Sequence, residues 1–332
     1  MASAGSMPHV VIVSPALREA NNGNWQTARR WQGHLSGEFA TRIVRQWPDD
    51  AASRDDIMIA LHARRSAESV AAWSRAHPGR GLALVLTGTD LYRDIREDAS
   101  AQRSLDLAGQ LVVLQECAPA ALPAAVRSRT RVIFQSTTSR QPATKSGGFL
   151  RTVTVGHLRD EKSPQTVFEA ARLLSRHGDI RMDLIGDALD PALGDAALAA
   201  MRTAPSFRWL GGRPHEDTRR RIQRAHLLIN CSRMEGGAHV IMEAVASGTP
   251  VLASAIAGNI GMLGPGYAGY FPPGDAAALA ALIRRCRDGQ RAPDGDLLQL
   301  LQAQCRSRAG LFAPEVERAA VLGLARELLL TV

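Results

Sequence analysis

The sequence predicts an α/β protein of two domains, each built around a parallel β-sheet. Its 332 residues exceed one ordinary domain and suit two of about 150 residues each. Short apolar, β-branched runs alternate with helical segments almost throughout, which is typical of a parallel sheet covered on both faces. A stretch without periodicity, residues 136–148, is rich in Ser, Thr, Pro and Gly and interrupts the alternation. We therefore expect a linker there and a domain boundary between residues 140 and 141.

In domain 1–140 the strands are apolar runs such as HVVIVS, and the helices lie between them. Asn24 is a good N-cap for the first helix. We expect strands at residues 9–14, 41–46, 56–61, 81–87, 111–115 and 132–135. We expect helices at residues 24–35, 66–76 and 119–127.

The same alternation restarts in domain 141–312, and three successive helices follow it, the last of which lies beyond this domain in residues 313–332. The expected strands are residues 151–155, 182–185, 207–210, 226–230 and 251–254. The expected helices are residues 163–177, 191–203, 214–224, 239–247, 276–287, 296–305 and 314–330. Both domains are therefore Rossmann-like, and we expect them to face each other across a cleft.

Composition and charge limit the classes of ligand and the cellular compartment that we expect for this protein. The formal net charge of +8 and the pI near 10.1 indicate anionic ligands. The Lys and Arg residues are scattered and aromatic residues make up only 5%, which argues against nucleic acid. Four widely separated cysteines indicate buried thiols in a reducing compartment. Residues 1–6 lack the features of a signal peptide, and the apolar runs are shorter than the ~20 residues that span a bilayer. We expect a cytoplasmic protein with no membrane partner.

The stretch SRMEGGAHVIMEAVASGTPVLAS, residues 232–254, places Glu235 and Glu243 around a helix start. In such sheets ligands bind at the carboxyl ends of the strands. Gly236 and Gly237 lack Cβ atoms and allow close approach of a ligand. Backbone N–H groups at the helix start, from Gly236 through Ala238 to His239, suit a phosphate or a sugar hydroxyl. The alternative makes Glu235 a partner of the helix dipole and Glu243 an exposed residue.

The spacing Glu-x7-Glu, with Gly-Thr-Pro-Val following at residues 248–251, resembles the signature of GT-B glycosyltransferases of the family 4 type. The resemblance implies that Glu243 binds the ribose hydroxyls of a nucleotide sugar and that Glu235 lies at the hexose. It also implies that the last helix, within residues 313–332, returns to the first domain.

In that family, a Gly-Arg-Leu-x-x-x-Lys pattern supplies two cations to the donor diphosphate. The stretch VGHLRDEKSP matches it with Gly156 and Lys162, but His157 stands at the arginine position and Arg159 follows two residues later. Histidine is mostly neutral at pH 7. We therefore assign Lys162 and Arg159 to the diphosphate and His157 as a neutral donor; the alternative leaves Lys162 in solvent.

Polar residues also follow the expected strands of the first domain. They form the predicted acceptor site, with one of Arg18, Arg64 or Arg93 supplying a cation; the alternatives are a helix cap for Asp90 and structural roles for the others. Trp25 and Trp31 lie six residues apart, so only one is expected to face the core. The predicted acceptor residues are Gly23, Asn24, His62, Thr87, Thr89 and Asp90.

Taken together, stretches such as GNWQTARRW, LHARRSA, TGTDLY, GHLRDEKSP and AGNIGMLGPGYAGYFPPGD resemble the selenosugar synthases of selenoneine biosynthesis, a branch of the GT-B fold. The resemblance implies transfer of a sugar from a UDP-sugar, UDP-GlcNAc or UDP-glucose, to selenophosphate, with no metal or other cofactor. Two alternatives stay open: a retaining glycosyltransferase that acts on a hydroxyl acceptor, and a non-catalytic nucleotide-binding module.

Overall fold

The computed structural model describes residues 7–18, 23–291 and 297–330. Residues 1–6, which bear on the signal-peptide prediction, and Asp296, the expected start of a helix, lie outside the described residues. The chain forms two compact units. The first comprises Met1–Ser136 together with Pro314–Val332, and the second comprises Thr137–Ala313. The first stretch thus ends at Ser136 rather than at residue 140.

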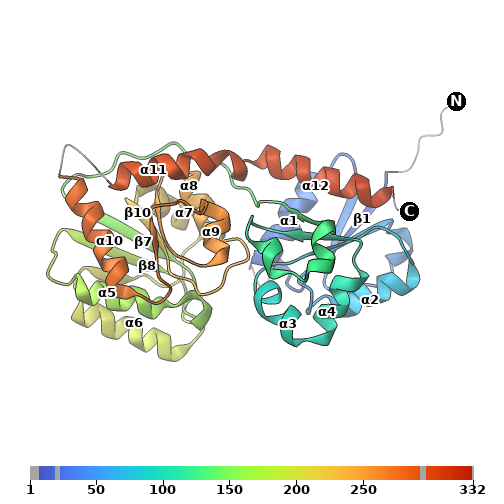
Figure 1. Cartoon of the computed structure of the whole chain (residues 1–332), viewed down its shortest axis with the longest axis horizontal. Helices are drawn as coiled ribbons and strands as arrows, with labels where there is room; N and C mark the ends of the chain where they lie inside the picture. The colour runs from blue at the N-terminus through green and yellow to red at the C-terminus, as the bar shows by residue number, and fades with distance from the viewer. Residues whose placement is uncertain (1–6, 19–22, 292–296, 331–332) are drawn as a thin grey trace. The chain divides into compact units, whose positions relative to one another are not determined.

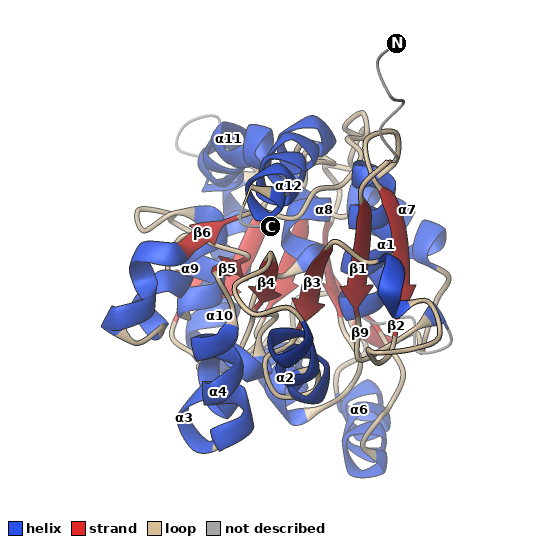
Figure 2. Cartoon of the chain, turned by 90° about the vertical axis from the view of Figure 1, so that its right-hand side faces the viewer, coloured by secondary structure: helices blue, strands red, loops and turns tan. Residues whose placement is uncertain are grey.

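The first unit contains one parallel sheet in the order β2-β1-β3-β4-β5-β6 (Figure 2). The chain places β2 on one side of β1 and then continues from β3 on the other. The strand order therefore reverses between β1 and β3. The strands are β1 (His9–Val13), β2 (Ala40–Val44), β3 (Ile57–Leu61), β4 (Leu82–Val85), β5 (Gln110–Val113) and β6 (Thr130–Val132). The α-helices of this unit are α1 (Gly23–Leu35), α2 (Ala67–Ala76), α3 (Ile95–Glu97), α4 (Ala99–Leu107) and α12 (Pro314–Leu329).

Both faces of this sheet are buried because successive strand residues point to opposite sides. Val10 and Ile12 of β1 pack with residues of α1 and α12. Val11 and Val13 pack with residues of α2 and α4 on the other face. Of the two tryptophans of α1, Trp31 is fully buried and Trp25 is half-buried. This confirms the prediction that only one of the two faces the core.

Three local predictions for this unit were wrong, and α4 was not predicted. The strand expected at residues 132–135 is β6, which spans Thr130–Val132. The helix expected at residues 119–127 is two 3-10 stretches, Ala118–Ala121 and Ala124–Arg129, because Pro123 has no N–H to continue an α-helix. No bounds were predicted for α4, which Asp98 caps by accepting from the backbone of Ser100 and Ala101. The first helix begins at Gly23, so Asn24 lies in its first turn rather than at the N-cap.

The second unit also contains one parallel sheet, in the order β12-β11-β10-β7-β8-β9. The chain runs from β7 outward to β9 and then returns to β10 on the other side of β7, so the order reverses between β7 and β10. The strands are β7 (Leu150–Val155), β8 (Ile180–Ile185), β9 (Phe207–Trp209), β10 (Leu227–Asn230), β11 (Val251–Ser254) and β12 (Tyr270–Phe271). The α-helices are α5 (Pro164–Leu173), α6 (Pro191–Thr203), α7 (His215–Arg224), α8 (His239–Val245), α9 (Ala257–Leu263), α10 (Ala276–Gly289) and α11 (Leu297–Arg308).

Most predicted elements of this unit are confirmed to within a few residues, with three differences. Helix α5 ends at Leu173, before the predicted residue 177. Helix α9 and the two-residue strand β12 were not predicted. Both are short, and α9 contains Gly258 and Gly261, so its sequence has the composition of a loop.

The last helix packs on the first unit, where α12 lies alongside α1 (Figure 1). Glu317 of α12 is buried, and it accepts hydrogen bonds from Arg30 at 2.6 Å, Trp31 at 2.7 Å and both the backbone and the hydroxyl of Ser136. His34 Nε2 lies 3.2 Å from the same carboxylate. These contacts attach the end of the chain to α1 and to the last residue before the second unit.

Across the described ranges, no helix combines the length and the apolar character needed to cross a membrane.

Candidate functional site

In the second unit, a narrow pocket opens at the carboxyl ends of β7 and β10, where the strand order reverses. This is the position at which open parallel sheets bind ligands. The pocket encloses about 10 Å³, enough for one water molecule, so any larger ligand must lie over its mouth. The lining residues are Thr154, Val155, Gly156, His157, Lys162, Pro164, Leu184, Ile229, Asn230, Cys231 and Ser232.

Lys162 and Glu235 meet at this pocket. Lys162 Nζ donates to Glu235 Oε1 at 2.5 Å, and Ser232 Oγ donates to the same oxygen at 2.6 Å. Burial alone would raise the pKa of Glu235, but the charge and hydrogen bond of Lys162, the bond from Ser232 and the charge of Arg159 outweigh it, so the pKa lies below its usual range. The site therefore holds a fixed pair of opposite charges at neutral pH.

The backbone turn after β7 brings Lys162 back toward the strand end. Ser163 adopts a left-handed conformation, with φ of 46°, between a 3-10 turn at Asp160–Lys162 and α5. The stem of Lys162 then lies over Gly156, and a Cβ at position 156 would meet the Lys162 Cδ at 3.4 Å. Gly186 supports this turn from β8, since a Cβ there would lie 2.0 Å from the Gly156 carbonyl oxygen.

His157 and Arg159 lie on the exposed side of the same turn. The backbone N–H of Asp187 donates to His157 Nδ1 at 3.1 Å, so a neutral ring carries its proton on Nε2. The Arg159 side chain is 49% exposed and lies 4.0 Å from Glu161, which leaves its guanidinium accessible to a ligand.

The loop that carries Glu235 leads directly into α8. Gly236 and Ala238 are buried, Gly237 and His239 are half-buried, and α8 begins at His239 without a side-chain cap at Ala238. Helix α9 packs against the backbone of this loop at Glu235. A Cβ at Gly258 would lie 2.1 Å from the Glu235 carbonyl oxygen, so only glycine allows this contact.

Glu243 lies inside α8 and is 6% exposed, so the alternative that placed it on an exposed face is wrong. Its Oε1 lies 2.7 Å from His215 Nε2, at the start of α7. The hydrogen bond to Glu243 raises the pKa of His215, against the opposing effect of burial. Because the His215 side chain is 70% exposed, it can move aside while Glu243 stays in place.

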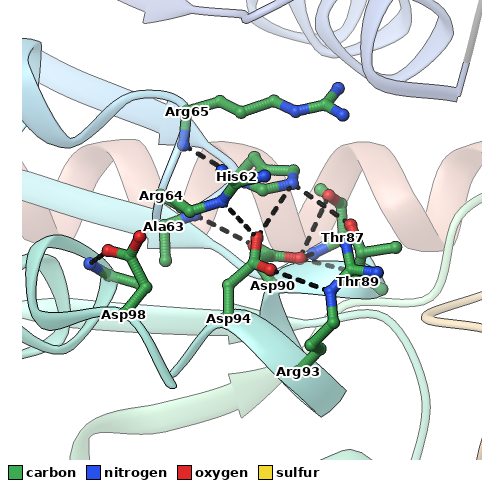
Figure 3. Close-up of polar contacts among 12 residues, drawn as sticks. His62, Ala63, Arg64, Arg65, Thr87, Thr89, Asp90, Arg93, Asp94 and Asp98 are labelled. Atoms are coloured by element: carbon green, nitrogen blue, oxygen red, sulfur yellow. Dashed lines mark hydrogen bonds and ion pairs between the residues drawn. The ribbon is translucent and has the colours of Figure 1, made fainter. Parts of the chain in front are cut away.

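In the first unit, the strand order reverses between β1 and β3, and His62 follows β3 directly (Figure 3). His62 is buried and has a φ of 74°, an uncommon conformation for a non-glycine residue that is found at functional sites. Burial lowers its pKa, so the ring is neutral at pH 7. The N–H of Arg65 donates to Nδ1 at 3.3 Å, and Nε2 lies 3.3 Å from Thr89 Oγ1.

Asp90 organises the loop after β4 from a fully buried position. Its Oδ1 accepts from the backbone of Thr87 and Gly88, both at 2.9 Å, and its Oδ2 accepts from Ala63 N at 3.0 Å. Asp90 thus ties this loop to the end of β3, and half-buried Thr87 and Thr89 lie beside His62. Gly23 and Asn24 lie instead in the first turn of α1.

Arg64 and Arg93 both bind one carboxylate in this region. Arg64 Nε lies 2.9 Å from Asp94 Oδ2, and Arg93 Nε lies 3.2 Å from Asp94 Oδ1. Figure 3 shows both side chains directed at Asp94, whereas the side chain of Arg65 extends away from it. Their positive charges are therefore partly offset within the unit.

Sequence reasoning missed three residues of the second site: Ser232, His215 and Gly258. Ser232 stands three residues before Glu235, a spacing that a hydroxyl and a carboxylate can bridge in one turn. Nothing in the sequence pairs His215 with Glu243, which are 28 residues apart. The role of Gly258 is recognisable only from the fold, which packs α9 against the loop that carries Glu235.

Comparison with known proteins gives matches of several kinds. Residues 135–294 match the family model described as glycosyl transferases group 1. The amylovoran biosynthesis glycosyltransferase AmsK of Erwinia amylovora is 30% identical over 149 residues, which span 42% of this chain and 37% of that protein. The structure of sucrose-phosphate synthase from Thermosynechococcus elongatus superposes with a TM-score of 0.79 at 17% identity, over 98% of this chain and all of that one.

A further solved structure, HepE of Anabaena in complex with UDP-glucose, superposes with a TM-score of 0.75 at 14% identity, over 96% of this chain and 99% of that chain. At such identities the superpositions establish the fold. The second unit thus carries the pattern of the group 1 glycosyl transferases, and the whole chain has the GT-B fold of two Rossmann-like parallel-sheet domains.

Proposed function

We propose that the protein transfers a sugar from a UDP-sugar, UDP-GlcNAc or UDP-glucose, to selenophosphate. The observation that supports the transferase part most strongly is the fixed charge pair of Lys162 and Glu235 at the carboxyl ends of β7 and β10. The family match of residues 135–294 and the UDP-glucose in the HepE structure favour a UDP-sugar donor. The choice of selenophosphate rests on the sequence resemblance.

On the donor side, each charged group has one task. Lys162 and Arg159 stabilise the negative charge that develops on the diphosphate as the bond from C1 to oxygen breaks. The backbone from Gly236 to His239 donates to the same oxygens, and His157 adds a neutral donor. When the donor binds, the ribose hydroxyls replace His215 as the hydrogen-bond partners of Glu243. Glu235 accepts a hydrogen bond from a hydroxyl of the hexose.

The reaction needs one bond exchange and one hydrolysis. The selenium of selenophosphate attacks C1 of the sugar, the C1–Se bond forms, and UDP departs with the electron pair of the broken C1–O bond. Water then cleaves the Se–P bond and gives a 1-selenosugar and phosphate. An anionic selenium is already a strong nucleophile, so no general base is required for the first step.

On the acceptor side, we assign His62, Thr87 and Thr89 to hydrogen bonds with the acceptor, together with Gly23 and Asn24 from α1. His62 acts as a donor through Nε2–H because its Nδ1 already accepts from Arg65. Asp90 positions this loop without touching the substrate, since its oxygens accept from backbone N–H groups.

Mass spectrometry of the products tests the proposal. The full chain is incubated with selenophosphate and, in separate reactions, UDP-GlcNAc, UDP-glucose and UDP-galactose. We expect a selenium isotope pattern on a hexose or N-acetylhexosamine, with UDP formed in equal amount. Parallel reactions offer common sugar and alcohol acceptors in place of selenophosphate, and another set contains EDTA.

Each outcome separates the candidates. Glycosides of the hydroxyl acceptors without selenosugar would establish the ordinary glycosyltransferase instead. UDP binding without any product would establish a nucleotide-binding module. Loss of activity in EDTA would refute the assignment of charge neutralisation to Lys162 and Arg159 without a metal.

A further inference from the structure

A second pocket lies wholly within the first unit, beside α1. Arg18 lines it from the segment after β1, and Trp25, Arg29 and Gln32 line it from α1. Positions 25, 29 and 32 fall on one face of the helix because they are four and three residues apart. The pocket measures about 310 Å³, and among the described residues none of those that line it is acidic. Its volume and its two arginines suit an anion of small-molecule size.

The two arginines of this pocket have uncompensated charges. Over the residues that the structure describes, neither Arg18 nor Arg29 makes an ion pair or a side-chain hydrogen bond, and both are exposed. Arg30, the next residue along the helix, is held by Glu317 at 2.6 Å. A guanidinium group can donate two parallel hydrogen bonds to two oxygens of one phosphate group.

The remaining lining residues provide a wall and a polar contact. Trp25 is half-buried and offers an indole face, which packs against the less polar side of a bound molecule. Gln32 Nε2 donates to the Thr41 carbonyl at 2.9 Å, which fixes the amide on the side of β2. The pocket thus has a cationic part and an apolar part.

The other candidate cations of this unit are less suitable. Arg64 and Arg93 share the carboxylate of Asp94, so an incoming anion would compete with an existing charge. The pocket instead adjoins the first turn of α1, where Gly23 and Asn24 are assigned to the acceptor.

We propose that this pocket binds the oxyanion of the acceptor, with Arg18 and Arg29 as its charged partners and Trp25 as its apolar wall. The identity of the acceptor rests on the proposed function, whereas the recognised chemistry is a phosphate-type oxyanion. A selenium or sulfur substituent packs against the indole, while the oxygens face the guanidinium groups.

Direct binding tests the pocket without catalysis. Inorganic phosphate and thiophosphate are titrated into the full chain and followed by calorimetry and by tryptophan fluorescence. Charge-assisted hydrogen bonds to one guanidinium correspond to about a ten- to hundredfold change in affinity. We expect Arg18→Gln and Arg29→Gln each to weaken binding by that factor and Trp25→Phe to remove the fluorescence response. Arg103→Gln, an exposed arginine on α4, is the matched control and should leave binding unchanged.

Two further variants can overturn the proposal. If phosphate binding is lost in Lys162→Ala and kept in Arg18→Gln, the anion binds in the second unit. If it is lost in Arg65→Gln and kept in both Arg18→Gln and Arg29→Gln, the oxyanion is held beside His62 alone and not by this pocket. Thermal unfolding of each variant shows whether a loss reflects misfolding: the substitutions of the exposed Arg18, Arg29 and Arg65 should leave the transition unaltered, whereas Lys162→Ala should lower it because Glu235 loses its ion-pair partner.

Kinetics then connect the pocket to the reaction. With selenophosphate as acceptor, Arg18→Gln and Arg29→Gln should raise the KM for selenophosphate about tenfold or more and leave the KM for the UDP-sugar unchanged. Unchanged KM values in both variants, in an enzyme that forms the selenosugar, would refute the pocket and leave the proposed function intact. If the wild-type chain forms no selenosugar, the proposed function fails, and phosphate binding still decides the pocket.

Discussion

At the scale of single side chains, the proposed donor binding depends most directly on Glu243. This side chain is buried, and it contacts His215, whose side chain is 70% exposed. We expect Glu243→Ala to weaken UDP binding by about 1–3 kcal/mol, the cost of leaving buried hydroxyls unpaired. Calorimetry measures this change, and Glu169→Ala, a surface glutamate on α5 that pairs with Arg172, is the control. Unaltered UDP affinity in Glu243→Ala would reject the ribose role.

His215 should make donor binding depend on pH. Its pKa is raised by Glu243, so the protonated ring binds the carboxylate more tightly in the ligand-free protein; Arg219 and Glu216 are the other charges that act on it. Proton binding therefore opposes ribose binding, and UDP affinity should fall as pH decreases through that raised pKa. His215→Gln should show a weaker dependence, measured as the difference from wild type so that titration of UDP itself cancels. If UDP affinity depends on pH in the same way in wild type and in His215→Gln, the replacement of His215 by the ribose hydroxyls is contradicted.

Lys162 should act on turnover more than on binding. In the proposed reaction, the negative charge that Lys162 contacts grows as the diphosphate departs, so its interaction is stronger in the transition state than in the bound donor. We expect Lys162→Ala to lower kcat by a larger factor than it weakens UDP-sugar binding, measured by steady-state kinetics and calorimetry. Lys162→Arg, which retains the charge opposite Glu235, should recover part of the turnover. Equal losses in both quantities would contradict this role.

At the scale of secondary structure, the attachment of α12 to α1 depends on Glu317. Burial alone would raise the pKa of Glu317, but the hydrogen bond from His34 and the charge and hydrogen bond of Arg30 lower it to about 2. Since the folded pKa is below the unfolded one, this group stabilises the protein above pH ~4.5, and the contribution is lost as pH falls toward 2.

Glu317→Gln should therefore lower the free energy of unfolding by about 3 kcal/mol at pH 7, and by less as the pH approaches 3. Glu327→Gln is a matched control on the same helix, because Glu327 pairs with Arg131 at the surface and should change stability by less than about 1 kcal/mol. Denaturant unfolding at several pH values measures both. Equal losses of unfolding free energy in the two variants would show that burial of the Glu317 carboxylate does not determine its contribution to stability.

The elements that sequence analysis predicted correctly are those with a strong periodic signal. The continuous apolar runs of β1, β3 and β10 and the complete span of α6 have such signals. The predictions failed where tertiary contacts decide the structure. Helix α9 has too many glycines to be recognised locally, yet it is stabilised by Asn259, which donates to the Ser254 carbonyl at 2.9 Å. The candidate site follows the same rule: Glu235 and Lys162 lie in motifs, whereas His215 is found only from the fold.

At the scale of the whole molecule, the two units should unfold in separate transitions, because each has its own sheet and core. UDP at about one hundred times its Kd stabilises the unit that binds it by ~2.7 kcal/mol. We expect the transition of Thr137–Ala313 to rise by about 5–10 °C in differential scanning calorimetry and the other transition to stay in place. Glu317→Gln should instead lower the transition that UDP does not move. A single transition that responds to both changes would contradict this independence.

The assignment of α12 to the first unit has a consequence for synthesis on the ribosome. A nascent chain generally folds domain by domain from its N-terminus. Here the first sheet emerges early but lacks the helix that covers part of one face until Pro314–Leu329 has been translated, because Val321, Leu324 and Leu328 belong to that face. The segment Thr137–Ala313 thus has all its parts outside the exit tunnel before the first unit does, and the first unit is completed after the second.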